Sequence, residues 1–183
     1  KRLAMMEGAK PNAAHFALAD LERSGAIKSV ITQNIDGLHQ AAGSKNVIEL
    51  HGNLRLSVCL DCRKTYPIEM LKRAKVPRCE VCGGLVKPNV ILFGEPLPQD
   101  EYDRATTEAT RCDLMVVVGS SLEVSPANLL PAIVKARGMK LAIVNLEPTQ
   151  FDTRADLVIR GKATDVLRAV RDEVGRARRC PRR

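Results

Sequence analysis

The sequence predicts an α/β protein with a parallel sheet, helices on both faces of that sheet, and a small inserted metal-binding module. Compact apolar runs at residues 28–32, 114–118, 141–144 and 157–159 alternate with helical patterns. This alternation is typical of strands joined by crossover helices. Four cysteines in two tight pairs lie in a polar stretch between these runs, which indicates a module of different character.

The first part of the chain is expected to form a helix and two strands. The helix should cover residues 12–23, beginning near Asn12 and ending at Gly25. Its expected apolar stripe consists of Ala13, Phe16, Ala17 and Leu21. A buried strand follows at 28–32, and 46–50 is a weaker strand candidate.

The rest of the chain divides into the module and a second α/β segment. Residues 53–86 are polar and contain only one short helical stretch, at 68–73. Further helices are expected at residues 99–110, 127–137 and 164–174. We therefore expect a larger domain formed by residues 1–52 and 89–183, interrupted by a small module at residues 53–88.

Composition excludes several classes of protein. With 45% hydrophobic and 27% charged residues among 183, the chain has the make-up of an ordinary globular protein. No apolar stretch approaches the roughly 20 residues that a membrane span needs, and no signal peptide opens the chain. We expect a cytoplasmic protein without a membrane partner.

The formal net charge of +8 raises the question of nucleic-acid binding. Much of the excess lies at the end of the chain, in Arg176, Arg178, Arg179, Arg182 and Arg183. Proteins that bind single strands usually stack bases on aromatic side chains. This chain has no Trp, two Tyr and three Phe, so we interpret the basic end as a solvated tail and do not expect a nucleic-acid partner.

The cysteine spacing predicts a structural zinc site. Two Cys-x2-Cys pairs, separated by sixteen residues, can close a tetrahedron around one Zn²⁺. The ligands would be Cys59, Cys62, Cys79 and Cys82. Four thiolates leave no open position, so the ion would be structural. The alternatives are four unrelated cysteines or an iron–sulfur cluster, which uses other spacings. Of the remaining cysteines, Cys112 is expected in the core and Cys180 has no expected role.

Small and polar residues follow the predicted strands. They are Gln33-Asn34-Ile35-Asp36, His51-Gly52, Gly119-Ser120-Ser121 and Asn145-Leu146-Glu147. Ligands of open parallel sheets bind outside the carboxyl ends of the strands. Backbone N–H groups and hydroxyls suit a phosphate or ribose, and a histidine suits general-base chemistry near neutral pH. The sequence therefore predicts a ligand crevice at these strand ends.

Several of these segments occur together, and in this order, in one known family. They are TQNIDGLH at 32–39, the His51-Gly52 pair, the two cysteine pairs, KPNVILFGE at 87–95, GSSLEVSPA at 119–127 and VNLE at 144–147. In this combination the chain resembles the sirtuins, a family of NAD-dependent protein lysine deacylases. The resemblance implies a Rossmann-like domain and a small zinc-ribbon domain, with NAD and acyl-lysine meeting between them.

The resemblance also implies roles for individual residues. The catalytic residues would be His51, as general base, with Asn34 and Asp36. Contacts to NAD would come from Gln33, Asn34, Ile35, Asp36, Gly119, Ser120, Ser121, Asn145, Leu146, Glu147 and Ala163. The acyl-lysine peptide would add as a strand between two edges that include Val90, Ile91, Phe93, Gly94, Glu95, Leu122 and Val124.

The implied reaction removes an acyl group from lysine. The acyl oxygen attacks the nicotinamide ribose carbon and expels nicotinamide, and His51 then helps a ribose hydroxyl attack the resulting imidate. The products are free lysine, nicotinamide and O-acyl-ADP-ribose. His15 and His39 are expected to be structural, and Asp36 and Asn34, taken alone, could merely cap a turn.

The chain departs from the family pattern at its start. Sirtuins open with a strand, a Gly-Ala-Gly phosphate loop and an Asp-Phe-Arg segment, and none of these is present in the sequence. The Gly-rich turn supplies most pyrophosphate donors in dinucleotide folds. We therefore expect residues 1–183 alone to bind NAD weakly and to be inactive as an enzyme.

Two other functions are compatible with the same residues. An NAD-dependent ADP-ribosyltransferase would share the first bond cleavage and release nicotinamide without deacylating lysine. A non-enzymatic zinc-ribbon interaction module would show salt-sensitive binding and no nicotinamide release.

Overall fold

The computed structural model describes residues 8–179, and its central feature is a set of parallel strands. β1 (Val30–Thr32) pairs with β2 (Val47–Glu49), and β6 (Leu114–Val118), β7 (Lys140–Asn145) and β8 (Leu157–Arg160) pair in that order. Each expected strand is present. The strands form two hydrogen-bonded sheets where a single sheet was expected, because no ladder joins β1 to β6 within the described residues.

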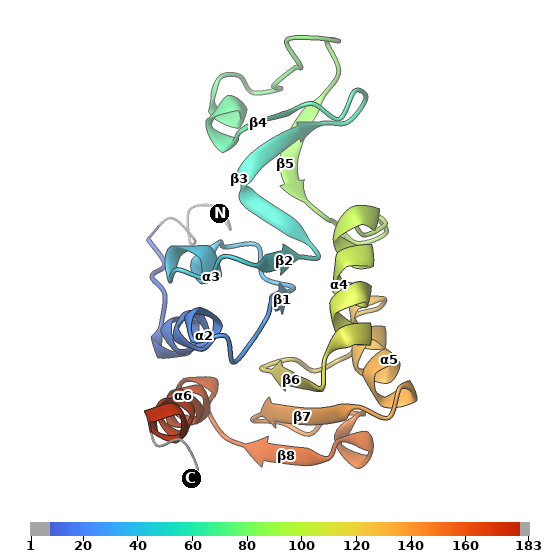
Figure 1. The fold of residues 1–183 in the computed structure, drawn as a ribbon. Coiled ribbons are helices and arrows are strands. Elements are labelled where there is room, and N and C mark those ends of the chain that lie inside the picture. The colour runs from blue at the N-terminus through green and yellow to red at the C-terminus, as the bar shows by residue number, and fades with distance from the viewer. Residues whose placement is uncertain (1–7, 180–183) are drawn as a thin grey trace.

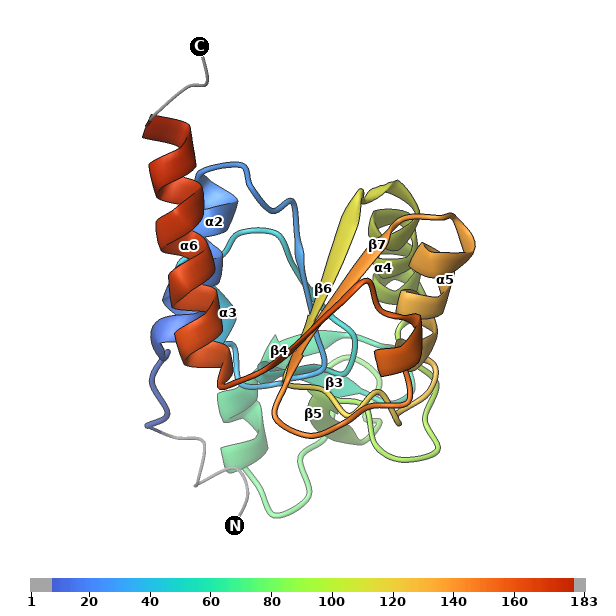
Figure 2. The same cartoon turned by 90° about the horizontal axis from the view of Figure 1, so that it is seen from below.

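Helices cover both faces of these strands, as predicted. α2 (Ala13–Arg23) and α6 (Ala163–Arg179) lie side by side on one face, and α4 (Gln99–Arg111) and α5 (Leu130–Ala136) lie on the other (Figures 1 and 2). A short helix, α3 (Leu38–Ala41), follows β1. The architecture is therefore the expected Rossmann-like arrangement of layers.

The helix α2 begins as the sequence suggests, but it buries a different face. The Asn12 side chain accepts from backbone N–H groups of the first turn, and the N3 residue His15 completes a capping box. The expected stripe was wrong at two positions, since Ala13 is exposed and Phe16 is 47% exposed. The buried side chains are Ala14, Ala17, Ala19 and Leu21. Small side chains are needed there because α6 packs closely, with Leu167 against Ala14 and Ala17.

The main core lies between the short sheet and the helices α4 and α5. Ile48 and Leu50 pack with Ala105, Ala109 and Val134, all nearly inaccessible to solvent. Cys112 packs against this cluster and is partly buried, in line with its expected place. A second cluster joins β7 to the 3-10 turn η3 (Asp152–Arg154) through Leu141, Ile143 and Phe151. Burial of these apolar side chains provides the main driving force for folding.

The cysteine module is built on a three-stranded antiparallel sheet. β3 (Gly52–Cys59) lies between β4 (Thr65–Pro67) and β5 (Val86–Val90). Figure 1 shows this sheet projecting from the rest of the molecule. The stretch expected to be helical, 68–73, forms the 3-10 helix η1 (Ile68–Lys72). Met70 and Tyr66 are buried there beside the cysteines, so the module has only a small apolar core.

Two helices differ in extent from expectation. The helix expected at 127–137 is divided into the 3-10 turn η2 (Ala127–Leu129) and α5, which carries Pro131 in its first turn, where a missing N–H is harmless. The helix α6 continues to Arg179 rather than ending at 174. Its basic last turn complements the negative end of the helix dipole. Cys180, Arg182 and Arg183 lie outside the described residues.

None of the helices in residues 8–179 combines the length and apolar character needed to cross a membrane.

Candidate active site and metal centre

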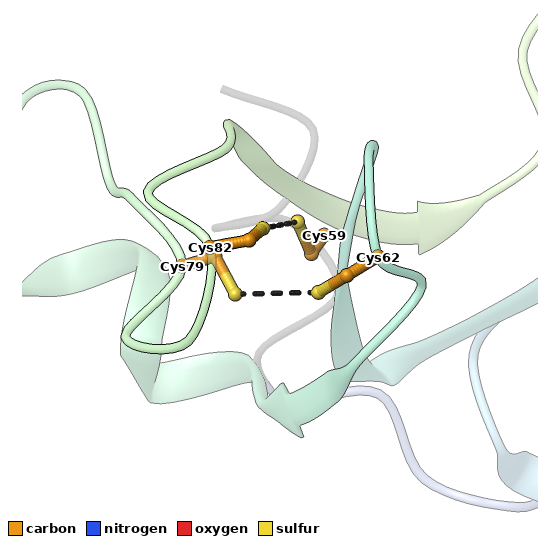
Figure 3. A group of neighbouring side chains, drawn as sticks. All are labelled: Cys59, Cys62, Cys79 and Cys82. Carbon is orange, nitrogen blue, oxygen red and sulfur yellow. Dashed lines mark hydrogen bonds between the residues drawn. The ribbon is translucent and has the colours of Figure 1, made fainter.

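The four predicted metal ligands come together at one end of the module (Figure 3). Their sulfur atoms all lie within 4.8 Å of one another, and the Cys59–Cys82 and Cys62–Cys79 sulfurs are 3.5 Å apart. In a tetrahedral site with Zn–S bonds of about 2.3 Å, sulfurs are separated by about 3.8 Å. The cluster therefore fits a four-coordinate Zn²⁺.

A buried tyrosine supports one of these sulfurs. The Tyr66 hydroxyl lies 3.0 Å from the Sγ of Cys79 and accepts a hydrogen bond from the backbone N–H of Glu80 at 3.1 Å. This contact lowers the pKa of the Cys79 thiol to about 6 and raises that of Tyr66 to about 12. The hydroxyl therefore stays protonated and donates to the sulfur, which favours the thiolate that a metal requires. Tyr66 was not among the residues expected at this site, although it lies between the two cysteine pairs in the sequence.

The candidate base His51 follows β2 and is held by a residue that follows β1. Its Nδ1 atom lies 3.1 Å from the carbonyl oxygen of Gln33. Because a carbonyl can only accept, Nδ1 must carry the proton, which leaves Nε2 of the neutral ring as an acceptor. The parallel pairing of β1 with β2 brings these two positions together.

The loop between β1 and α3 is tightly ordered by local contacts. The Asn34 N–H donates to the Thr32 hydroxyl at 3.0 Å, and Oδ1 of Asp36 accepts from the Leu38 N–H at 2.9 Å. Asp36 thus caps the turn immediately before α3, as expected for this residue taken alone. Between Asn34 and Asp36, the carbonyl of Ile35 accepts a hydrogen bond from the Leu54 N–H at 3.0 Å. The loop is therefore anchored to the first residues of β3.

One of the two expected peptide-binding edges lies directly beside His51. The Ile91 N–H donates to the His51 carbonyl at 3.0 Å, and Val90 pairs with Gly52. A Cβ on Gly52 would stand 2.1 Å from the Asn89 carbonyl oxygen, so only glycine permits this approach. The structure thus joins the candidate base to the segment that begins at Val90.

An ion pair between Lys87 and Glu95 lies at the end of this segment. The Lys87 Nζ lies 2.6 Å from Oε1 of Glu95, and Glu95 also accepts from the Leu92 N–H. This hydrogen-bonded pair lowers the pKa of the Glu95 carboxyl. Phe93 is fully exposed at the tip of the loop, next to Gly94 with a φ of 87°. Phe93 is therefore available for contact with a ligand.

At the other expected edge, Leu122 is part of the protein core and Val124 is not. Leu122 is buried with Leu141, Ile143 and Phe151, and its carbonyl accepts a hydrogen bond from the Gln150 side chain. Val124 is 44% exposed. Of the two residues named for this edge, only Val124 offers its side chain to solvent.

The predicted nucleotide-binding loops follow β6 and β7. The Gly119 N–H donates to the Val144 carbonyl at 2.9 Å, and the Asn145 side chain donates to the Glu147 carbonyl at 2.9 Å. Nothing lies within 4 Å of a Cβ placed on Gly119, so the backbone there is open to a ligand. Ser121, Leu146 and Glu147 are exposed. These exposed donors and acceptors fit the ribose and phosphate groups of a nucleotide.

The structure thus assembles two groups of candidate residues. One contains Gln33, Asn34, Ile35, Asp36 and His51, and the other contains Gly119, Ser120, Ser121, Asn145, Leu146 and Glu147. None of the hydrogen bonds described above joins one group to the other. Ala163 lies at the start of α6 and packs against the cluster of Ala14, Ala17 and Leu167.

The model of the Sir2 family matches residues 1–126. The chain belongs to the Sir2 family.

Similar curated proteins have NAD-dependent activities in their names. An NAD-dependent protein deacetylase of Thermodesulfovibrio yellowstonii is 50% identical over 171 residues, covering 91% of this chain and 67% of that protein. NAD-dependent protein deacylase 2 of Archaeoglobus fulgidus is 53% identical over 175 residues, covering 93% and 69%. The Sir2-family chain described here thus spans about two thirds of the length of these relatives.

Solved Sir2 structures share the fold. A complex of Sir2 with a p53 peptide and NAD⁺ superposes with a TM-score of 0.85 at 49% identity, covering 93% of this chain and 72% of that one. Sir2Tm bound to a propionylated peptide gives a TM-score of 0.85 at 49% identity, covering 93% and 73%. The Rossmann-like fold expected from the resemblance is confirmed.

Proposed function

We propose that the protein containing this chain removes acyl groups from protein lysines in an NAD-dependent reaction that yields nicotinamide and O-acyl-ADP-ribose. The observation that carries the proposal is the position of His51, which is hydrogen-bonded to Gln33 of the β1 loop and to Ile91 of the exposed edge. Relatives named as NAD-dependent deacetylases and deacylases support it, as do Sir2 structures with acetylated and propionylated peptides.

His51 serves as the general base in this proposal. Its protonated Nδ1 is held by Gln33, so Nε2 is free to accept a proton from a ribose hydroxyl. A fixed ring orientation avoids reorganisation during proton transfer, which is the advantage of a preorganised site. NAD supplies the ribose carbon to which the acyl oxygen is transferred and the nicotinamide that leaves.

The remaining residues bind and orient. Gln33, Asn34, Ile35 and Asp36 would contact nicotinamide and its ribose, where the Asp36 cap keeps the loop in place. Gly119, Ser120, Ser121, Asn145, Leu146 and Glu147 would hold the adenosine half, with Ala163 nearby at the start of α6. In this scheme residues 1–52 and 89–183 form the nucleotide-binding domain, and residues 53–88 form the zinc module.

The acylated peptide would bind as an additional strand. Val90, Ile91, Gly94 and Glu95 would form one edge, and Leu122 and Val124 would belong to the other. The exposed Phe93 ring would contact the acyl-lysine chain. The reaction has both transferase and hydrolase character.

A cytoplasmic location is also part of the proposal, because cysteines without disulfide bonds suit a reducing compartment.

The test is a product analysis with the whole protein, an acetyl-lysine peptide and NAD. Deacetylated peptide, nicotinamide and O-acetyl-ADP-ribose should appear in equal amounts, and His51→Ala should suppress the deacetylated product. Nicotinamide release accompanied by ADP-ribosylated protein, without deacetylation, would instead establish a transferase. Absence of any NAD consumption would refute both enzymatic functions.

A further inference from the structure

A charged cluster lies beside the candidate site, and none of its members belongs to the site described so far. Its centre is Glu49, the last residue of β2, two positions before His51. The Arg55 guanidinium binds its carboxylate in bidentate fashion, with distances of 2.9 and 2.8 Å. The Gln40 amide donates to Oε1 at 2.8 Å, and the Asn53 amide donates to Oε2 at 2.9 Å. Each carboxylate oxygen therefore accepts two hydrogen bonds.

The four residues come from three different elements. Glu49 belongs to β2, Gln40 to α3, and Asn53 and Arg55 to β3 at the start of the zinc module. Asn53 is 6% exposed, and its Oδ1 accepts from the Arg55 and Leu56 N–H groups. The cluster thus joins the module to the strand that carries the base.

The arginine is also in contact with the loop between β1 and α3. A Cβ placed on Gly37 would stand 2.8 Å from the Arg55 Nη1, so the guanidinium lies directly against the loop backbone. The neighbouring Leu54 N–H donates to the Ile35 carbonyl at 3.0 Å. Leu54 and Arg55 therefore contact the residues on either side of Asp36, Ile35 and Gly37 respectively.

The geometry favours a specific role over a general stabilising one. The side chain of Glu49 is 12% exposed and that of Arg55 is 46% exposed. An exposed arginine paired to one carboxylate contributes little to stability, but a planar bidentate pair fixes orientation. Its fixed position places the guanidinium directly against the Gly37 backbone.

We propose that Glu49 and Arg55 are positioning residues, which together hold the loop of residues 33–38 against His51. The inference rests on the proposed function for its kinetic consequence. The ordering of the loop by Arg55 is a separate, structural consequence. Neither residue needs to touch substrate, because Arg55 acts through Gly37 and Glu49 acts through Arg55.

Hydrogen exchange of the whole protein tests the structural consequence without any assay of activity. Arg55→Met removes the guanidinium, while Glu49 keeps its bonds from Gln40 and Asn53, so folding is preserved. Amide exchange in residues 33–38 should accelerate by roughly tenfold or more, because local opening becomes easier. The matched control is Arg176→Met, which removes an ion-paired arginine of α6 that is 68% exposed. It should leave exchange in residues 33–38 unchanged.

Kinetics test the catalytic consequence. Arg55→Met should lower kcat by roughly 10- to 100-fold, the effect of a small misplacement of reacting groups, while the KM for the acyl-peptide and the zinc content stay unchanged. Arg55→Lys keeps the positive charge but cannot form the bidentate pair with Glu49, so it should give an intermediate kcat. Glu49→Gln should resemble Arg55→Met, because its amide nitrogen cannot accept from Arg55.

Several outcomes would overturn the inference. Wild-type exchange in residues 33–38 together with a wild-type kcat in Arg55→Met would show that the arginine positions nothing. Uniformly faster exchange across the chain would show a merely structural role. If the wild-type protein consumes no NAD, the proposed function fails, but the exchange experiment still decides whether Arg55 orders the loop.

Discussion

His51 and Gln33 are joined by a hydrogen bond of 3.1 Å between Nδ1 of the imidazole and the main-chain carbonyl oxygen. The two residues follow neighbouring parallel strands, β2 and β1. This bond selects the tautomer that leaves Nε2 as the proton acceptor. A backbone partner also means that no substitution of the Gln33 side chain can remove it directly.

His51→Ala should therefore abolish most activity without disturbing the fold. In the whole protein we expect deacylation to fall by about 10²- to 10⁴-fold, the usual effect of losing a general base. Steady-state assays with an acetyl-lysine peptide measure this loss. Zinc content and the urea unfolding curve should match the wild type. A well-folded variant with full activity would remove His51 from the mechanism.

The cysteine cluster should hold one Zn²⁺ per chain, measurable by elemental analysis. Cys59→Ser should release the metal and increase amide exchange first in β3, β4 and β5, because the module has little apolar core and depends on the metal for folding. Cys112→Ser is the matched control, since this cysteine packs against the main core, and it should retain zinc. A metal-free Cys59→Ser protein with a fully protected module would contradict the structural role.

Tyr66→Phe should weaken metal binding while leaving the four ligands in place. The change removes only the hydroxyl that lies 3.0 Å from Cys79, and loss of such an outer-shell partner typically costs about 10- to 100-fold in affinity. Competition with a chromogenic chelator measures the change. Tyr102→Phe, on α4, serves as the control and should have wild-type affinity. Equal zinc affinity in the two variants would rule out support by Tyr66.

Stability should depend on Asp156 in a defined pH range. Hydrogen bonds from the Lys135 ammonium, the Leu141 N–H and the Lys140 ammonium lower the pKa of this carboxyl. A folded-state pKa below the unfolded value of about 3.9 gives stabilisation that is present above that value. It is lost as the pH falls below about 4, toward the folded-state pKa.

Asp156→Asn should thus lower the Tm at pH 7. The difference in Tm between the variant and the wild type should become smaller as the pH falls below about 4. Thermal unfolding followed by circular dichroism at several pH values measures this gap. Asp165→Asn provides the comparison, because this carboxylate is 62% exposed and its ion pair with Arg168 is longer, at 3.4 Å. A gap for Asp156→Asn that stays constant down to acidic pH would contradict the electrostatic explanation.

Local patterns in the sequence were sufficient to predict most of the secondary structure and the cysteine cluster. Apolar runs identified β6, β7 and β8 because β-branched and other apolar residues favour strands, although of these three strands only β7 is mostly buried. The cysteine spacing identified the cluster because ligand geometry restricts the spacing of each pair. The start of α2 could also be predicted, because the Asn12 side chain caps backbone N–H groups only two and three residues away.

Contacts between distant segments were decided by the tertiary structure. The sequence placed Phe16 on the buried face of α2, but only the close packing of α6 shows that small alanines occupy that face and Phe16 remains exposed. No motif in the sequence singles out Glu49 or Arg55, and their proposed role depends on Gly37, which is brought to them by the pairing of β1 with β2. The sequence by itself determined which residues are candidates for the chemistry, through local periodicity and motif spacing. The tertiary structure determined how they are held, because the groups that orient them come from other elements and are paired only after the chain has folded.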